Sequence, residues 1–115
     1  MTKTKTVFMH YTPGSIVDIA HASTPDGFTM TSIASQASDH EKIEALADAE
    51  FLLGFAPIVS EAVLRTAPKL KLIQVASAGY DTLDLDVLRE LGIPLATSTG
   101  VNAAVVAEHT IALLL

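Results

Sequence analysis

Three segments of this sequence each follow a short apolar run, and two of them carry residue types that suit a small anion. They are His10–Ser15, Ala76–Leu83 and Thr97–Asn102. In an open parallel sheet, ligands bind beyond the carboxyl ends of the strands. If the apolar runs are parallel strands, the three segments meet at one edge of the sheet and form a candidate binding site there.

The middle segment has the clearest chemical signal. It begins Ala76-Ser77-Ala78-Gly79, and such small side chains let backbone N–H groups approach an anion closely. A loop of this kind suits a substrate carboxylate. The alternative is a tight turn in which Gly79 is needed only for its backbone angles.

The third segment precedes a predicted helix that begins near Asn102. Asparagine is a good N-cap residue, and the N-terminus of a helix attracts anions. The alternative is an ordinary capped helix that binds no ligand.

Catalytic and metal-ligating side chains are not evident. The four histidines are His10, His21, His40 and His109. No two of them share the i, i+4 spacing of ligands on one helix, so we expect no metal. Glu108 and His109 are adjacent and therefore point apart on a helix, which excludes a general-base pair. We expect no catalytic residue in this chain.

Other catalytic signatures are missing as well. The only arginines, Arg65 and Arg89, fall late in predicted helices and away from the ligand edge. The sequence contains neither Gly-x-Gly-x-x-Gly nor a Walker loop. The chain offers loops that suit a small anion, without the groups that would transform it.

Apolar runs alternate with helical patterns along the chain, and this alternation predicts the elements that position the loops. The predicted strands are Val7–Met9, Phe28–Ile33, Phe51–Phe55, Leu72–Ala76 and Ile93–Ala96. The helices between them are expected to start at the caps Ser15, Ser38 with Glu41 as a capping box, Ser60 and Asp84, and Gly92 is expected to close the last of them. Ile43, Leu46 and Ala47 are the predicted buried face of the second helix, and Leu72–Ala76 is expected to be buried on both faces.

These elements predict an α/β fold with a five-stranded parallel sheet and helices on both faces. We expect the flavodoxin-like strand order 2-1-3-4-5. The apolar segment Ala103–Leu115 has no helix stop signal, and we interpret it as a helix truncated in its middle. The alternative is a natural terminal helix docked into a groove.

The composition of the chain limits the classes of partner that it can bind. The 115 residues are half apolar, contain no cysteine and carry a net charge of −6. An acidic chain with few, scattered basic residues is a poor partner for nucleic acid or an anionic membrane surface. With no signal-peptide pattern and no apolar run of membrane-spanning length, we expect a cytoplasmic protein.

Five motifs occur in order in the second half of the chain. They are Pro68-Lys69-Leu70-Lys71-Leu72-Ile73, Ser77-Ala78-Gly79-Tyr80-Asp81-Thr82-Leu83-Asp84, Leu91-Gly92-Ile93-Pro94, Gly100-Val101-Asn102 and Val106-Ala107-Glu108-His109-Thr110. With these motifs, the sequence from Ala67 to Leu115 resembles the D-isomer-specific 2-hydroxyacid dehydrogenases, which include phosphoglycerate, glycerate and formate dehydrogenases. The stretch from Val7 to Thr66 fits only the general pattern.

The resemblance implies an oxidoreductase that transfers hydride between NAD or NADP and a small D-2-hydroxy or 2-keto acid. By resemblance, Ala76, Ser77, Ala78 and Gly79 bind the substrate, and Asn102 and Val106 lie near the cofactor. Glu108 and His109 match a family signature in which they look structural.

The resemblance also implies which parts the chain contains. Residues 1–101 would be the first part of the substrate domain, and 102–115 would begin a helix that crosses to a nucleotide-binding domain. The family's catalytic Arg, Glu and His lie beyond that point, so we expect this chain alone to be inactive and to bind no cofactor. The complete enzyme is expected to be a homodimer.

Two other functions stay open at this stage. One is a flavin- or phosphate-binding module, which Thr97–Asn102 faintly resembles, although a flavodoxin phosphate loop follows the first strand. The other is a truncated pseudo-enzyme that acts by dimerising. The sequence does not distinguish NAD from NADP, because the residue that contacts the ribose 2′ position would lie in the nucleotide-binding domain.

Overall fold

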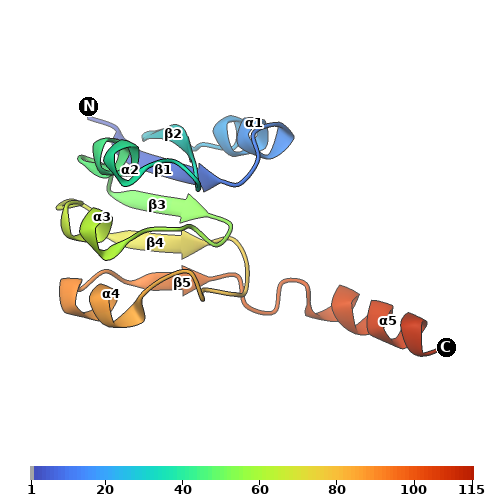
Figure 1. Ribbon diagram of the computed structural model, residues 1–115. Coiled ribbons are helices and arrows are strands. Elements are labelled where there is room, and N and C mark those ends of the chain that lie inside the picture. The colour runs from blue at the N-terminus through green and yellow to red at the C-terminus, as the bar shows by residue number, and fades with distance from the viewer. Residues whose placement is uncertain (1) are drawn as a thin grey trace.

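A computed structural model describes residues 2–115, and it consists of five strands and five helices in alternation. In chain order they are β1 (Thr4–His10), α1 (Ser15–Ala22), β2 (Phe28–Ala34), α2 (Asp39–Leu46), β3 (Phe51–Gly54), α3 (Glu61–Arg65), β4 (Leu72–Val75), α4 (Leu85–Leu91), β5 (Leu95–Thr97) and α5 (Ala103–Leu114). All strand pairs are parallel, and the order is β2-β1-β3-β4-β5 (Figure 1). The predicted fold class and strand order are confirmed.

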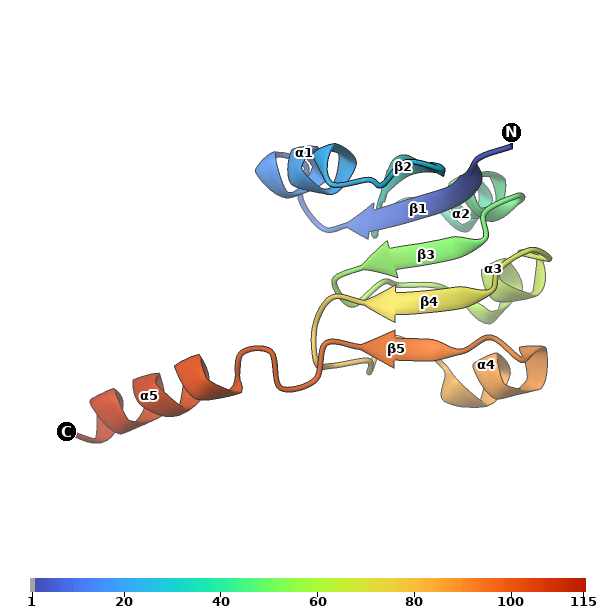
Figure 2. The same cartoon turned by 180° about the vertical axis from the view of Figure 1, so that it is seen from behind.

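The helices cover the two faces of the sheet unequally. Helices α2, α3 and α4 lie along one face, and α1 lies on the other near the β1–β2 end (Figures 1 and 2). Side chains under the three helices are buried, among them Ile73 and Val75 of β4. Leu72 and Gln74, which alternate with them, are only half-buried. The expectation that β4 is buried on both faces is therefore wrong, because no helix of the described residues covers its second face.

Of the four N-caps predicted for α1–α4, three form as expected. The Ser38 hydroxyl accepts from the N–H of Glu41 while the Glu41 carboxylate accepts from the N–H of Ser38, which completes the capping box. Ser60 caps α3 and Asp84 caps α4 through their side chains. Gly92 ends α4 with φ 67°, the left-handed conformation that glycine adopts without strain.

The fourth predicted cap is wrong. Ser15 is the first residue of α1, and the N-cap position belongs to Gly14, which makes no side-chain cap. Gly14 has φ 128°, which a side chain disfavours. The turn at Thr12–Gly14 thus starts the helix through backbone freedom, one residue earlier than a serine cap would.

Helix α2 buries the predicted face only in part, and Ile43 of that face packs half-buried against the core. Leu46 is buried, but Ala47 is exposed and Lys42 is buried instead. The Lys42 ammonium reaches back along the helix and donates to the carbonyl oxygen of Ser35 at 2.7 Å. Because its aliphatic stem packs inward while its charge finds a carbonyl, lysine here occupies a buried position that the apolar pattern does not assign to it.

Helix α5 leaves the sheet and projects into the surroundings (Figures 1 and 2). Every residue from Thr99 onward is exposed, including the large apolar residues Val101, Val105, Val106, Ile111, Leu113, Leu114 and Leu115. A helix that is apolar on most sides normally packs against other protein. Among the described residues, no helix is long and apolar enough to cross a membrane.

Candidate anion-binding site

The three predicted loops do meet at the carboxyl edge of the sheet, because β1, β4 and β5 run in the same direction (Figure 1). A fourth loop, after β3, joins them and was missed in the sequence. The Tyr11 hydroxyl donates to the carbonyl oxygen of Ala56 at 2.9 Å, and the Thr82 hydroxyl donates to that of Pro57 at 2.8 Å. The loop after β3 (the β3 loop) is thus tied on one side to the loop after β1 (the β1 loop, His10–Ser15). On the other side it is tied to the loop after β4 (the β4 loop, Ala76–Leu83).

Ala56 has φ 45°, the one left-handed non-glycine residue of the described chain. Such a conformation costs free energy unless the surroundings hold it. Two hydrogen bonds supply that support: Tyr11 donates to the carbonyl oxygen of Ala56, and Thr82 donates to that of the next residue, Pro57. No sequence pattern signals a left-handed alanine, which explains why this loop was not predicted.

The backbone of the β4 loop offers three free donors. The N–H of Ala76 already donates to the carbonyl oxygen of Gly54 at 2.8 Å, so Ala76 contributes no free amide. The N–H groups of Ser77, Ala78 and Gly79 donate to no group within residues 2–115. Ser77 is half-buried and the next two residues are exposed. Successive free amides in one turn form the concave donor set that binds anions.

Gly79 is not required by the conformation of this loop. Its φ lies outside the left-handed region, and a Cβ built there would lie 3.6 Å from Oδ2 of Asp81, an ordinary contact. The alternative interpretation, a turn that needs glycine at position 79 for its backbone angles, is therefore not supported. A glycine that the fold does not need is consistent with one that leaves room for a ligand.

The β5 loop packs against the β4 loop through Ser98. Its N–H donates to the carbonyl oxygen of Ser77 at 3.1 Å and its hydroxyl to that of Val75 at 3.3 Å. The hydroxyls of Thr97 and Thr99 bond to each other at 2.6 Å. The two loops with the predicted anion chemistry are thus one connected structure.

Asn102 stands at the N-cap position of α5, but its side chain makes no capping hydrogen bond. The expected cap is wrong, because φ −109° and ψ 9° place the residue outside the extended region from which a cap reaches the first turn. Its amide side chain is left exposed beside Gly100. Val106, one turn into the helix, is exposed as well.

Titratable groups are few at this edge. Asp81 is the only charged side chain of the β4 loop. His10 ends β1, where its carbonyl oxygen accepts from the N–H of Ser35 at 2.7 Å, and its Nδ1 is buried without a partner in the described part of the chain. No three His, Asp or Glu side chains among residues 2–115 come close enough to hold a metal ion.

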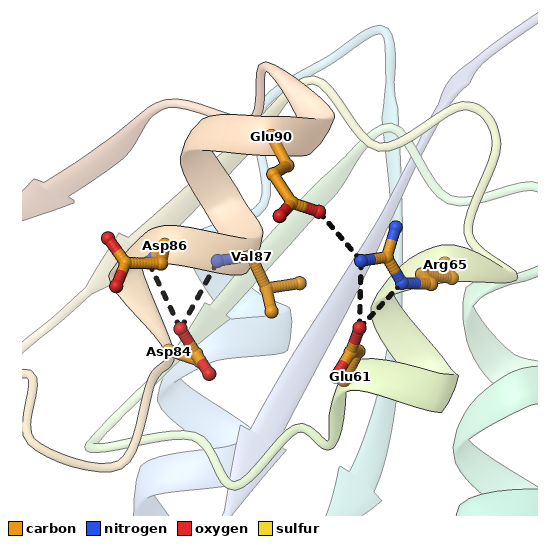
Figure 3. A network of polar contacts seen from close by, with 6 residues as sticks. All are labelled: Glu61, Arg65, Asp84, Asp86, Val87 and Glu90. Carbon is orange, nitrogen blue, oxygen red and sulfur yellow. Dashed lines mark hydrogen bonds and ion pairs between the residues drawn. The ribbon is translucent and has the colours of Figure 1, made fainter.

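The arginines lie at the opposite edge, as predicted from their helix positions. Arg65 at the end of α3 pairs with Glu61 on its own helix and with Glu90 on α4, each at 2.7 Å (Figure 3). The hydrogen bonds that Arg65 donates to Glu90 and then to Glu61 raise the pKa of Arg65 above its ordinary value. Arg89 pairs with Asp86 on its own helix. Of these pairs only Arg65–Glu90 joins α3 to α4, and neither arginine lies near the candidate site.

A hollow lies elsewhere on the described residues, between α2 and the edge strand β2. Its volume is about 500 Å³, and Glu41, Glu44 and Asp48 line it together with Thr29 and Thr31. Carboxylates repel an anion, so this groove is unsuited to the chemistry that the β4 loop offers.

Comparisons with known proteins point to one family. Residues 11–112 match the family profile "D-isomer specific 2-hydroxyacid dehydrogenase, catalytic domain". A glyoxylate/hydroxypyruvate reductase B from Yersinia enterocolitica is 36% identical over 97 residues, which cover 83% of this chain and 30% of the relative. A putative 2-hydroxyacid dehydrogenase from Haemophilus influenzae is 34% identical over 77 residues, 67% of this chain and 24% of the relative.

Solved structures have the same arrangement. The 2-hydroxyacid dehydrogenase from Ketogulonicigenium vulgare matches 99% of this chain with a TM-score of 0.76 and 25% identity, over 35% of its own length. The D-lactate dehydrogenase from Aquifex aeolicus, solved with NAD and lactic acid, matches 94% with a TM-score of 0.73 and 26% identity, over 32% of its length. The chain therefore spans about a third of the length of the proteins it matches.

Proposed function

Because this chain belongs to the D-isomer-specific 2-hydroxyacid dehydrogenase family, we propose that it supplies the substrate-binding part of an enzyme that interconverts small D-2-hydroxy acids and 2-keto acids. The substrate carboxylate binds at Ser77, Ala78 and Gly79, with Ala76 as the residue that anchors the loop to β3. The names of the matched relatives give glyoxylate, hydroxypyruvate and lactate as their substrates, which favours a substrate of this size.

The three free amides at the carboxyl edge are the observation that carries the proposal. Hydrogen bonds to a charged group are each worth about 1.5–3 kcal/mol, more than bonds between neutral groups. A carboxylate has enough acceptor sites for all three donors. Backbone donors have a fixed direction, so they also orient the adjacent keto carbon relative to the rest of the site.

The second part of the proposal concerns the division of the chain. Residues 1–101 form the first part of the substrate domain, and residues 102–115 begin a helix that leads to a nucleotide-binding domain. The exposed apolar surface of α5 and its direction away from the sheet support this assignment. The proposal extends to a cytoplasmic homodimer for the complete enzyme, which sedimentation analysis would test.

NAD or NADP is the proposed cofactor of the complete enzyme, and it supplies or accepts the hydride when bound. Two residues of this chain fit a position at its rim. Val106 offers an exposed apolar contact, and Asn102 offers a side-chain amide that no intramolecular bond occupies. Neither would move a proton, and this chain's own task is to bind and orient the keto acid.

A hybrid enzyme tests the proposal. Residues 1–115 would replace the matching N-terminal part of the Yersinia enterocolitica reductase, and NADH oxidation would be followed with glyoxylate and with hydroxypyruvate. We expect turnover with at least one of them. A folded hybrid that binds NADH but reduces neither acid would contradict the proposal.

Gly79→Val locates the site within that hybrid. The added methyl groups occupy the space over the free amides, so we expect KM for the keto acid to rise about tenfold or more while the affinity for NADH stays nearly unchanged. Ala62→Val, on an exposed position of α3 far from the loop, is the matched control. An unchanged KM in Gly79→Val would remove the β4 loop from the substrate site.

A further inference from the structure

Ser98 connects the end of β5 to the end of β4 at two points. Its N–H bonds the carbonyl oxygen of Ser77 at 3.1 Å, and its hydroxyl bonds that of Val75 at 3.3 Å. The neighbouring hydroxyls of Thr97 and Thr99 bond each other. Ser98 is half-buried, whereas Thr99 is exposed. Ser98 is thus the residue of this loop whose side chain and backbone both hold the β4 loop.

One of these bonds sets the direction of a free amide, that of Ala78. In a planar trans peptide the C=O and N–H groups point in opposite directions. When Ser98 holds the carbonyl of Ser77, the N–H of Ala78 in the same peptide unit is turned away from β5. When its hydroxyl holds the carbonyl of Val75, the N–H of Ala76 points the other way, and there it donates to Gly54 at 2.8 Å.

A further bond continues the same pattern along the loop. The Ser77 hydroxyl donates to the carbonyl oxygen of Gly79 at 3.3 Å. The carbonyls of Val75, Ser77 and Gly79 are therefore each held, while the amides of Ser77, Ala78 and Gly79 stay free. Donors whose direction is fixed before a ligand arrives bind it without reorganisation.

We propose that Ser98 is a positioning residue for the carboxylate site: without contacting the ligand, it aims the free amide of Ala78 in the β4 loop. The inference rests on the proposed function, since it assigns a role within that site. Loss of the hydroxyl removes one of the two bonds that hold Ser98 against the β4 loop, and it thereby loosens the second bond, which orients the Ser77–Ala78 peptide unit. The ligand must then order the loop, which weakens binding.

The test is an NMR titration of the ¹⁵N-labelled chain, residues 1–115, with pyruvate as the probe. In the wild-type chain we expect saturable shifts of the amide signals of Ser77, Ala78 and Gly79. Ser98→Ala should weaken binding about fivefold, the effect of one hydrogen bond. Ser98→Thr keeps the hydroxyl and should bind within about twofold of wild type. Thr99→Ala, the matched control, should bind as wild type does.

The outcomes separate the two proposals. Wild-type affinity in Ser98→Ala, with the same amides shifted, would overturn the role of Ser98 and leave the site intact. No shift of these amides in the wild-type chain would overturn the site itself, and the role of Ser98 with it.

A second measurement needs no variant and covers the case in which Ser98→Ala fails to fold. The scalar coupling across the hydrogen bond between the Ser98 nitrogen and the Ser77 carbonyl carbon reports that bond directly. We expect it in the free chain and expect pyruvate to strengthen it. A free chain without the coupling would overturn the inference.

Discussion

Two glycines at the carboxyl edge are expected to respond in opposite ways to the same substitution. At Gly54 a Cβ would lie 2.6 Å from the carbonyl oxygen of Met9, a backbone atom of the neighbouring strand β1. At Gly79 the nearest atom would be 3.6 Å away, at the end of the Asp81 side chain. Gly54 is buried between the two central strands and Gly79 is exposed.

The magnitudes follow from these contacts. Gly54→Ala must push β1 and β3 apart or shift the backbone, and overpacking of this kind costs about 1–3 kcal/mol or more. Gly79→Ala meets no clash and needs no left-handed φ, so it should be neutral or should stabilise by up to about 1 kcal/mol, because alanine restricts the unfolded chain. The difference between the two variants is about 1–4 kcal/mol.

Urea unfolding followed by circular dichroism measures this difference. With m values of about 1–3 kcal/mol per molar urea, Gly54→Ala should lower the midpoint by roughly 1 M, and Gly79→Ala should leave it unchanged or slightly higher. A destabilisation of Gly79→Ala above about 1 kcal/mol would refute the reasoning, because the loop would then need its glycine for folding. A neutral Gly54→Ala would show that the strands are less closely spaced than described.

Three further outcomes are expected. The hydrogen bond from the Ser38 N–H, and then the bond from the Ser38 hydroxyl, lower the pKa of Glu41 below its ordinary 4.5. The ionised Glu41 therefore stabilises the folded chain fully above pH 4.5, and this stabilisation is lost as the pH falls through the lowered pKa. Glu41→Gln should flatten the fall in Tm between about pH 5 and 3, and an unchanged slope relative to the control Asp26→Asn would count against this. Titration calorimetry of the 115-residue chain with NADH should show no binding tighter than about 100 μM, roughly −5.5 kcal/mol, because one apolar contact at Val106 supplies only about 1–2 kcal/mol; tighter saturable binding would contradict it. The double variant Leu113→Glu, Leu114→Glu should lower the binding of an apolar dye to the chain, and an unchanged signal would mean that α5 is not its exposed apolar surface.

Local sequence signals predicted most of the fold because the elements are short and individually marked. The capping box at Ser38–Glu41, the caps at Ser60 and Asp84 and the glycine at 92 each satisfy backbone groups within one turn, so a pattern of a few residues contains the whole interaction. The strand order followed from the alternation of strands and helices, because right-handed crossovers leave few arrangements. Element ends moved by one to three residues, as at β5, which is Leu95–Thr97 and not Ile93–Ala96.

The site was less predictable because its interactions join residues far apart in the chain. Small residues after β4 indicated the anion loop, yet only the structure shows that the amide of Ala76 is already bonded to Gly54, 22 positions earlier. The bonds from Tyr11 to Ala56 and from Thr82 to Pro57 span 45 and 25 positions. No local pattern encodes a hydroxyl that reaches a carbonyl at such a separation.

The wrong expectation for β4 has a physical explanation that bears on the proposed function. A near-continuous apolar run, Leu72-Ile73-Gln74-Val75-Ala76, is typical of a strand covered on both faces, and Phe51–Leu53 of β3 has the same character. Within residues 2–115, α2–α4 cover one face of the sheet and α1 covers only the β1–β2 end of the other (Figures 1 and 2). Phe51, Leu53 and Leu72 of β3 and β4 stay half-buried. The apolar helix α5 is unpacked as well. Both surfaces are unusual for a chain that functions alone and ordinary for one that packs against further protein, which is the arrangement we propose for an enzyme about three times as long.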